Sequence, residues 1–151
     1  MLIVFNDTIS STSILLNCGV TWHMFTSQKH FTTYKEFSNE FIIVSSHNHV
    51  SVSGQGSVLF LTKLPDGQLN ITLYNVLHIP YLGTNLVSLG ALYHQGVSMK
   101  DFDNRLIFSK DNEKLFRTSL TGSTRTLYYI QCTTSVTSAT YLAGSLLSMH
   151  F

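Results

Sequence analysis

The chain has 151 residues, of which 44% are hydrophobic and only 11% charged, and its net charge is +1. This length suits one domain with ample apolar material for a core, and the near-neutral charge without a basic cluster gives no support for an electrostatic nucleic-acid interface. The charged fraction is well below the ~25% of an average soluble domain. It suits a chain that is mostly strand, one that buries surface against a partner, or one that has drifted without selection for solubility.

Two further observations bear on the compartment. Cys18 and Cys132 are the only cysteines, too few for a disulfide framework or a four-ligand zinc site, so they are interpreted as reduced, unrelated thiols. The apolar start at residues 1–5 is short, has no basic leading region and is interrupted by Asn6, which argues against a signal peptide. No apolar run approaches the roughly 18 residues of a membrane span. We therefore expect an intracellular protein, cytoplasmic or nuclear, that is not secreted and has no membrane partner.

In chain order, residues 1–12 form a Ser/Thr-rich lead-in, and residues 22–34 are expected to be an irregular loop with a helical turn. Gly54-Gln55-Gly56 is expected to interrupt a strand, and residues 47–49 to form a turn. Short apolar or alternating segments predict strands at residues 13–17, 41–44, 50–53, 57–62 and 69–79.

The segment 65–79 carries the clearest local signals. Pro65-Asp66-Gly67 predicts a hairpin turn, because Pro presets the turn and Gly accepts a positive φ. Leu69, Ile71 and Leu73 then alternate on one face of the returning strand. The alternation slips near Tyr74-Asn75, which predicts a bulge or bend there.

Leu86, Leu89 and Tyr93 share one helical face, so residues 86–96 are predicted to form the one convincing helix, with Thr84 or Asn85 as its N-cap and Gly96 at its end. The tail from residue 133 to 151 is expected to form a weak helix. Four more short strands are predicted, at residues 97–99, 105–109, 114–118 and 126–131, with turns at 101–104 and 111–113 between the first three. Together these elements predict an all-β fold, a small closed or partly closed β-barrel with one short helix near residues 85–95.

One motif indicates a family. Residues 15–24 read Leu-Leu-Asn-Cys-Gly-Val-Thr-Trp-His-Met. This string resembles the protease opening of copia-type retrotransposon Gag-Pol polyproteins, in which a hydrophobic pair precedes Asp-Ser-Gly-Ala-Thr/Ser, one residue and His-Met. Trp22 departs from the small or polar residue usual at its position.

Three further landmarks match in order: Gly54-Gln55-Gly56-Ser57-Val58 resembles a Gly-x-Gly-x-Val stretch, residues 74–80 resemble Asp-Val-Leu-Tyr-Val-Pro, and residues 85–96 resemble Asn-Leu-Leu-Ser and the helix after it. The resemblance implies an acid-protease-like (retropepsin-like) β-barrel over residues 13–118. Residues 119–151 are then the start of a pre-integrase-like segment, because residues 127–130 resemble its beginning. The resemblance also implies a homodimer in which each chain supplies one Asp. The ancestral substrate would be a segment of the polyprotein.

The position of the catalytic Asp holds Asn17. In that mechanism two carboxylates share a proton, since two negative charges so close cannot both ionise, and an amide has no proton to share. Cys18 replaces a bracing hydroxyl with a weak donor, whereas Gly19 is retained. The chain offers only eight other carboxylates, which fall mostly in predicted turns or polar stretches: Asp7, Glu36, Glu40, Asp66, Asp101, Asp103, Asp111 and Glu113.

The sequence therefore predicts a degenerate, inactive aspartic-protease-like domain, in which Asn17, Cys18 and Gly19 form a degenerate loop. Three alternatives stay open: a dimerising binding or structural module derived from such a domain, residual aspartic endopeptidase activity, and a pseudogene fragment that folds poorly. No cofactor, metal or nucleic-acid partner is predicted.

Other candidate sites have simpler explanations. His47 and His49 could form half of a metal site, but a turn position explains them as well. Ser88, His94 and Asp101 have the residue types of a hydrolase triad without a Gly-x-Ser-x-Gly elbow. His23 is expected to pack or hydrogen-bond near the Gly19 turn, and Gly54-Gln55-Gly56 is not followed by the helix that a phosphate loop needs. Four aromatic residues are interpreted as core residues on strand spacing and not as a base-stacking platform, which would need neighbouring Lys or Arg: Phe102, Phe108, Phe116 and Tyr128.

Overall fold

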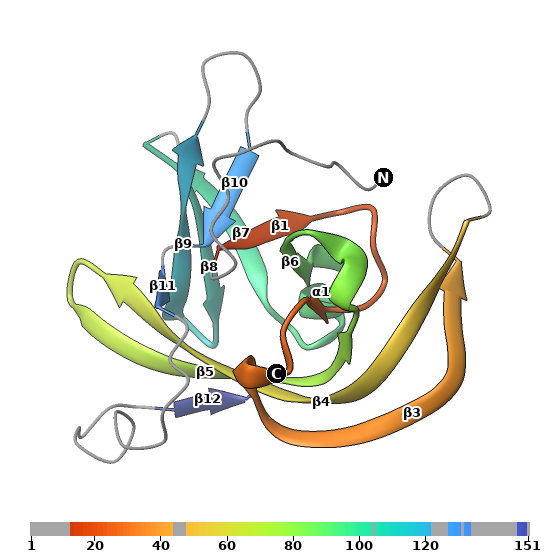
Figure 1. Cartoon of the computed structure of the whole chain (residues 1–151). Helices are drawn as coiled ribbons and strands as arrows, with labels where there is room; N and C mark the ends of the chain where they lie inside the picture. The colour runs from red at the N-terminus through yellow and green to blue at the C-terminus, as the bar shows by residue number, and fades with distance from the viewer. Residues whose placement is uncertain are drawn as a thin grey trace.

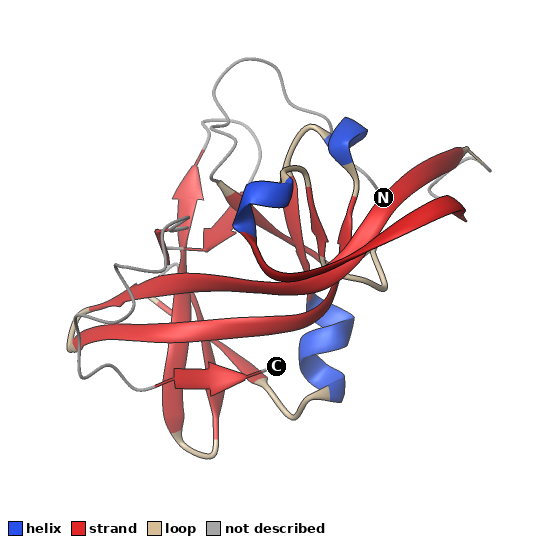
Figure 2. Cartoon of the chain, turned by 60° about the horizontal axis from the view of Figure 1, so that its bottom comes forward, coloured by secondary structure: helices blue, strands red, loops and turns tan. Residues whose placement is uncertain are grey.

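The computed structural model describes residues 13–43, 48–103, 105–121, 127–130, 132–133 and 148–150. Over this part of the chain nearly every element is a strand, as Figure 2 shows in red, and α1 (Leu89–His94) is the one α-helix. The other blue segments in Figure 2 are short 3-10 turns. The predicted all-β class is confirmed. The strands are β1 (Ile14–Asn17), β2 (Met24–Phe25), β3 (Phe31–Ile43), β4 (His49–Leu64), β5 (Gly67–His78), β6 (Asn85–Ser88), β7 (Ser98–Phe102), β8 (Arg105–Lys110), β9 (Glu113–Thr121), β10 (Leu127–Ile130), β11 (Cys132–Thr133) and β12 (Ser148–His150), with short 3-10 turns η1 (Gln28–His30) and η3 (Pro80–Leu82).

The strands join in the order β11-β4-β5-β2-β6-β1-β10-β9-β8-β7, while β3 pairs with β4 and β12 with β5. The resulting sheet curls around the middle of the molecule, so that β4 and β5 face the β8–β10 end across the centre (Figure 1). This is the architecture of a small β-barrel. Most neighbours are antiparallel, but β1 runs parallel to β6 with Asn17 opposite Ser88.

The central strands β1, β2 and β6 lie between two cores. In β1, Ile14 packs into a large cluster with Phe25, Phe60 and Phe116, whereas Leu15 packs into a smaller cluster on the other side with Met24 and Leu86. A strand that is buried on both faces has no polar alternation. This explains why the apolar run at 14–16 belongs to a strand.

β3 and β4 form a long curved arm whose far end extends beyond the rest of the molecule (Figure 1). The predicted break at residues 54–56 is wrong, because β4 runs through it. Gly56 lies where β3 comes closest: a Cβ on Gly56 would stand 1.8 Å from the carbonyl oxygen of Thr33, and one on Gly54 would meet the ring of Tyr34. The two glycines therefore permit close strand pairing. The start of β3 at Phe31 also shortens the predicted irregular loop.

The β4–β5 hairpin agrees with its sequence signals. Pro65 and Asp66 form the turn, Gly67 has a φ of +143°, and the three predicted inward residues of β5 are buried. The predicted slip is confirmed as well, since Asn75 has a φ of +56° and the register with β4 shifts at this point. The bulge turns both Tyr74 and Asn75 outward.

The helix predicted for residues 86–96 starts later in the structure than expected. Residues 85–88 form strand β6, and the helix starts at Leu89 with Ser88 as its N-cap instead of Thr84 or Asn85. Pairing with β1 favours the extended conformation over the local helical pattern. Gly96, with a φ of +82°, follows the helix as expected.

Strands β7–β9 form two hairpins. Asp111 and Asn112 both have positive φ, which is the type I′ turn that matches the twist of a hairpin. Phe108 and Phe116 are core residues with stacked rings whose centroids lie 4.6 Å apart, as predicted. Phe102 is not a core residue, because its side chain is 64% exposed.

Most of the tail, like the side chain of Tyr128, lies outside the described residues. The helix predicted for residues 133–151 is wrong at Thr133, which ends β11, and at Ser148–His150, which form β12. Among the residues described, no helix has the length and apolar character needed to span a bilayer.

Candidate active-site loop

Asn17 stands at the end of β1, where the chain turns. Its side chain is only 8% exposed, whereas Cys18 and Gly19 are exposed at the loop surface. The Asn17 Oδ1 accepts a hydrogen bond from the Gly19 N–H at 2.6 Å. A side chain that binds the backbone two residues on closes an Asx-type turn. The loop therefore holds a buried polar side chain beside an exposed glycine.

Ser88 braces this loop from β6. Its Oγ donates to the Val20 carbonyl at 2.7 Å and accepts from the Ala91 N–H at 3.1 Å. One buried hydroxyl thus ties the loop to the first turn of α1. From the sequence, Ser88 was considered only as a residue of the type found in hydrolase triads. Its bracing role depends on the parallel pairing of β1 with β6, which no local sequence pattern shows.

His23 lies under the same loop, as expected. Its Nδ1 accepts a hydrogen bond from the Ser88 N–H at 3.0 Å, so the neutral ring carries its proton on Nε2. Burial disfavours the charged imidazolium and lowers the pKa of His23 to about 4. His23 is therefore a neutral hydrogen-bond acceptor at physiological pH and fixes the distance between loop and strand.

Asn85 joins three segments at the other end of β6. Its Oδ1 accepts from the Thr26 N–H at 2.9 Å and from the Thr26 hydroxyl at 3.2 Å, while its Nδ2 donates to the Ser13 carbonyl at 3.1 Å. The predicted role of Asn85 as a helix cap is thus replaced by a cross-link between the start of β1 and the end of β2.

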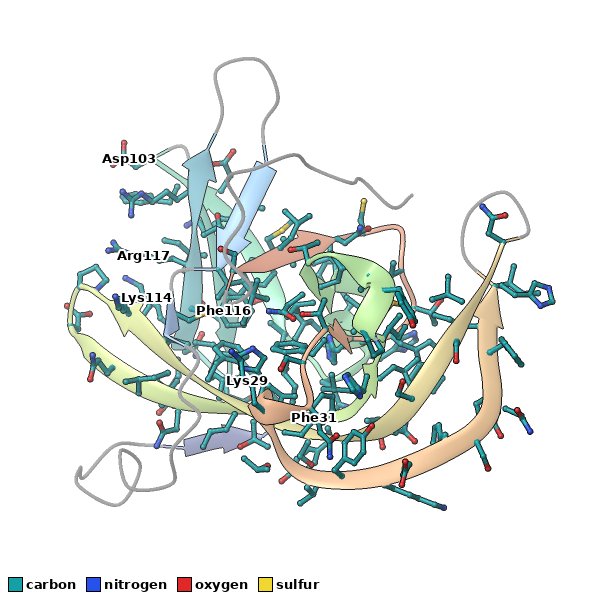
Figure 3. The ribbon with its side chains drawn as sticks, viewed as in Figure 1. Lys29, Phe31, Asp103, Lys114, Phe116 and Arg117 are labelled. Carbon is teal, nitrogen blue, oxygen red and sulfur yellow. The ribbon has the colours of Figure 1, made fainter. Side chains whose placement is uncertain are left out.

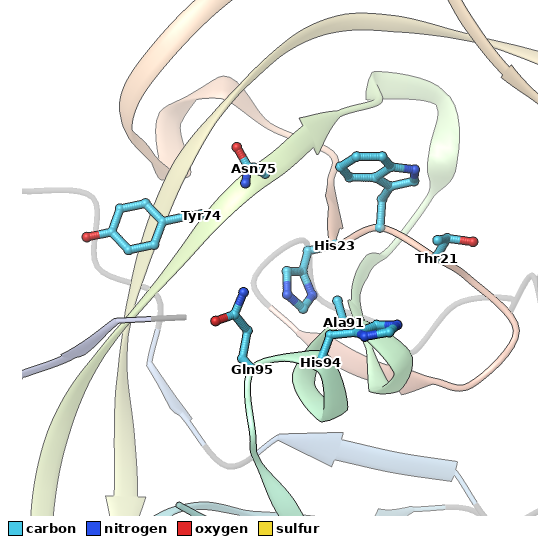
Figure 4. A pocket seen from close by; sticks show the side chains of 8 residues that line it. Thr21, His23, Tyr74, Asn75, Ala91, His94 and Gln95 are labelled. Carbon is cyan, nitrogen blue, oxygen red and sulfur yellow. The ribbon is translucent and has the colours of Figure 1, made fainter.

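A hollow of about 570 Å³ opens beside the loop. Figure 4 shows His94 on α1, His23 on the segment that leads into β2, and Tyr74 and Asn75 on the bulge of β5. Asn17 does not line this hollow. The lining consists of Thr21, Trp22, His23, Tyr74, Asn75, Ala91, His94 and Gln95.

A second group of polar side chains holds the arm to β5. The Tyr34 hydroxyl lies 2.8 Å from the His78 Nδ1, and the rings of Phe31, Tyr34 and His78 meet edge to face. Burial lowers the pKa of His78, against a smaller opposing effect of a hydrogen bond to the Thr26 backbone. Burial, with a smaller contribution from Glu36, raises the pKa of Tyr34.

The described carboxylates lie at the surface of the molecule. Seven of the eight carboxylates predicted as surface residues are described, and all seven are exposed; Asp7 lies outside the described residues. A dyad needs two carboxyl groups held together in a shielded site. Since all seven are exposed, the described residues hold no such shielded pair.

The remaining candidate sites are not assembled. His94 and Asp101 are exposed on α1 and β7, while the Ser88 hydroxyl is already bonded on both sides. His49 is exposed at the start of β4, and His47 lies outside the described residues. Over the described part of the chain, no group of three or more His, Cys, Asp or Glu could hold a metal ion. Burial raises the pKa of the Cys132 thiol to about 12, against a smaller opposing effect of Lys63, which disfavours the nucleophilic thiolate.

Comparison with known proteins gives one match. Residues 14–97, more than half of the chain, match the family model described as "Pol polyprotein, beta-barrel domain". The matched span contains the Asn17 loop, the arm, the bulge of β5, β6 and α1. No curated protein and no solved structure matches.

Proposed function

The chain belongs to the Pol polyprotein beta-barrel domain family, and on this premise we propose that it is a catalytically silent, copia-type aspartic-protease-like domain of a retrotransposon polyprotein. The observation that carries the proposal is the loop at residues 17–19. It keeps a turn that presents a buried side chain beside glycine, while that side chain is an amide. The intracellular location and the boundary near residue 118 remain predictions.

The geometry supports a retained loop. Asn17 lies at the end of a strand that is buried on both faces, its Oδ1 accepts the Gly19 N–H, and Ser88 and His23 hold the loop from below. An Asp carboxylate has nearly the same shape as the amide, and its oxygen could accept the same hydrogen bond. The site is thus suited to a carboxylate that the sequence lacks.

The chemistry argues against activity. Hydrolysis by a carboxylate dyad needs one group to take a proton from water and another to donate one to the scissile carbonyl. The Asn17 amide neither accepts that proton nor donates one in the working pH range. In a homodimer the same substitution would remove both carboxylates at once.

The test is to restore the acid. Purified Asn17→Asp and unmodified chains are incubated at mildly acidic pH with peptides from the polyprotein linkers. We expect the variant to cleave them in a pepstatin-sensitive way, with activity that rises faster than in proportion to protein concentration because two chains form the site. The matched control is Asn75→Asp, which makes the same chemical change on the exposed bulge of β5 and should stay inactive.

Two results would count against this proposal. Pepstatin-sensitive cleavage by the unmodified chain would establish residual endopeptidase activity instead. A folded, dimeric Asn17→Asp variant without any cleavage would show that more than the acid has been lost.

A second candidate function is a self-association module. The end of the β3–β4 arm exposes Phe41 by 58% and Ile43 by 68%, while Phe37 and Ile42 contact the smaller core. Exposed apolar groups at the end of an arm suit a contact with a second copy. Analytical ultracentrifugation should then show a dimer that Phe41→Ser with Ile43→Ser converts to monomer. A strictly monomeric, folded wild type excludes this candidate.

A further inference from the structure

A second hollow, of about 260 Å³, opens at the opposite end of the molecule from the arm. Strand pairing builds its floor: Phe102 pairs with Arg105 across the β7–β8 turn, and Ile107 pairs with Arg117 across β8 and β9. The β4–β5 turn supplies one wall. The lining consists of Leu64, Pro65, Phe102, Asp103, Arg105, Ile107, Lys114 and Arg117.

The lining is cationic although the chain as a whole is nearly neutral. Three of its nine Lys and Arg residues, Arg105, Lys114 and Arg117, line this hollow, against the single carboxylate of Asp103. Figure 3 shows Asp103, Arg117 and Lys114 along the same side of the molecule. The Arg117 Nε is buried and has no hydrogen-bond partner among the described residues. An excess of cations with an unsatisfied guanidinium donor favours an anionic ligand.

An exposed aromatic ring stands beside these cations. Phe102 is 64% exposed, and the exposed part of its ring is available for stacking. Phe102 was predicted to be a core residue and not part of a base-stacking platform, but its ring is exposed and three Lys and Arg residues line the same hollow. A ring for stacking next to cations for phosphate is the combination that binds single-stranded nucleic acid without sequence preference.

We propose that this hollow binds one nucleotide of a single-stranded nucleic acid, with the base stacked on Phe102 and the phosphates beside Lys114 and Arg117. Charge complementarity and the unsatisfied Arg117 donor select this occupant over an apolar peptide. All the charged and aromatic residues involved lie outside residues 14–97, so the proposal is independent of the proposed loss of peptidase activity.

The test uses the full chain and a short fluorescein-labelled oligouridylate, with its oligodeoxyuridylate counterpart, which differs only in lacking the 2′-hydroxyl groups, in fluorescence anisotropy titrations. We expect a Kd in the micromolar range that weakens as salt rises from about 50 to about 200 mM. Phe102→Ala should weaken binding roughly 5- to 100-fold through lost stacking, and Phe102→Tyr should retain it. Lys114→Gln and Arg117→Gln should each lower the salt slope by about 0.7 to 1.

Matched controls are Tyr81→Ala, which removes another exposed ring, and Lys35→Gln, which removes an exposed cation on β3; neither residue lines the hollow. Thermal melts monitored by circular dichroism verify the fold of each variant. A preference between the two oligonucleotides identifies RNA or DNA as the natural source of the strand. The proposal is overturned if the wild type does not bind at low salt, or if the control variants lose as much affinity as Phe102→Ala and Lys114→Gln. Equal binding of a blunt duplex, whose bases are not free to stack on Phe102, would also overturn the proposal.

Discussion

At the scale of single residues, Ser88 ties the Asn17 loop to the neighbouring strand and helix. The backbone N–H of Ser88 donates to His23, and its hydroxyl joins Val20 to Ala91. One residue therefore connects the loop, the strand that pairs with β1, and the helix. Ser88 also lies in the part of the chain that matches the family.

We expect Ser88→Ala to destabilise the fold by roughly 2–3 kcal/mol, because it removes an N-cap and leaves the Val20 carbonyl without its buried donor. Urea unfolding followed by circular dichroism measures the loss. The matched control is Ser98→Ala, whose Oγ donates to the Ser109 carbonyl at an exposed site and should cost well under half as much. Equal losses for both variants would show that Ser88 is not a brace.

At the residue scale, the sequence predicted a buried strand that ends at Asn17, and the burial of this side chain confirms it. The resemblance implies an acid where this chain has the Asn17 amide, and the loss of an acid there stays a prediction. Ser88 and Asn85 were assigned to other roles. Their hydrogen bonds join residues more than 50 positions apart in sequence, and no spacing within a short window contains that information.

At the scale of elements, substitution of Gly56 and of Gly90 by Ala should change the stability of the fold in opposite directions. Gly56→Ala would place its Cβ 1.8 Å from the Thr33 carbonyl oxygen, so β3 must separate from β4. We expect a loss of roughly 1–3 kcal/mol, as for other overpacked positions. Gly90 lies inside α1 with its nearest neighbour, the Ser88 Oγ, at 3.8 Å. Gly90→Ala should therefore stabilise the chain by about 0.5–1 kcal/mol through helix propensity.

Urea unfolding of both glycine variants under one set of conditions gives the comparison. Tolerance of Gly56→Ala without loss of stability would mean that the arm is not held closely at this point. A loss of stability in Gly90→Ala would contradict the open space around the helix.

Elements that local signals determine were predicted correctly, whereas those that long-range strand pairing determines were not. The Pro65-Asp66-Gly67 turn and the bulge at Tyr74-Asn75 were predicted correctly, because turn chemistry and a slipped alternation act within a few residues. Residues 86–88 have the apolar spacing of a helix, yet pairing with β1 makes them a strand. Gly54 and Gly56 were wrongly expected to interrupt a strand. Their absence of a side chain lets β3 pair closely with β4, and this long-range pairing is not visible in the local sequence.

At the scale of the whole molecule, neutral buried histidines couple the fold to pH. His23 holds the loop to β6, and His78 holds the arm to β5. Burial lowers the pKa of both below the ordinary value of 6.5. A charged imidazolium at either site would lose its solvation and, at His23, the acceptor for the Ser88 N–H.

The direction of the effect follows from linkage. A histidine whose pKa is lower in the folded state favours folding fully above about pH 6.5, and this contribution is lost as the pH falls toward the folded pKa, about 4 for His23. His23 alone should therefore remove roughly 3 kcal/mol of stability between these limits, and His78 acts in the same direction. Urea unfolding from about pH 7.5 to about pH 5 should show a steady decline.

His23→Asn isolates the contribution of one ring. Its Oδ1 can still accept the Ser88 N–H, but it cannot be protonated, so stability should fall less steeply with acid than in the wild type. His94→Asn, at an exposed position on α1, should keep the wild-type slope. Stability that is equal at about pH 7.5 and about pH 5 would contradict the coupling.

The same linkage sets the conditions under which Asn17→Asp can be assayed for the proposed activity. A carboxylate dyad works best in acid, whereas the loop that must hold it is weakened there, so we expect activity of Asn17→Asp to end on the acid side where the fold is lost.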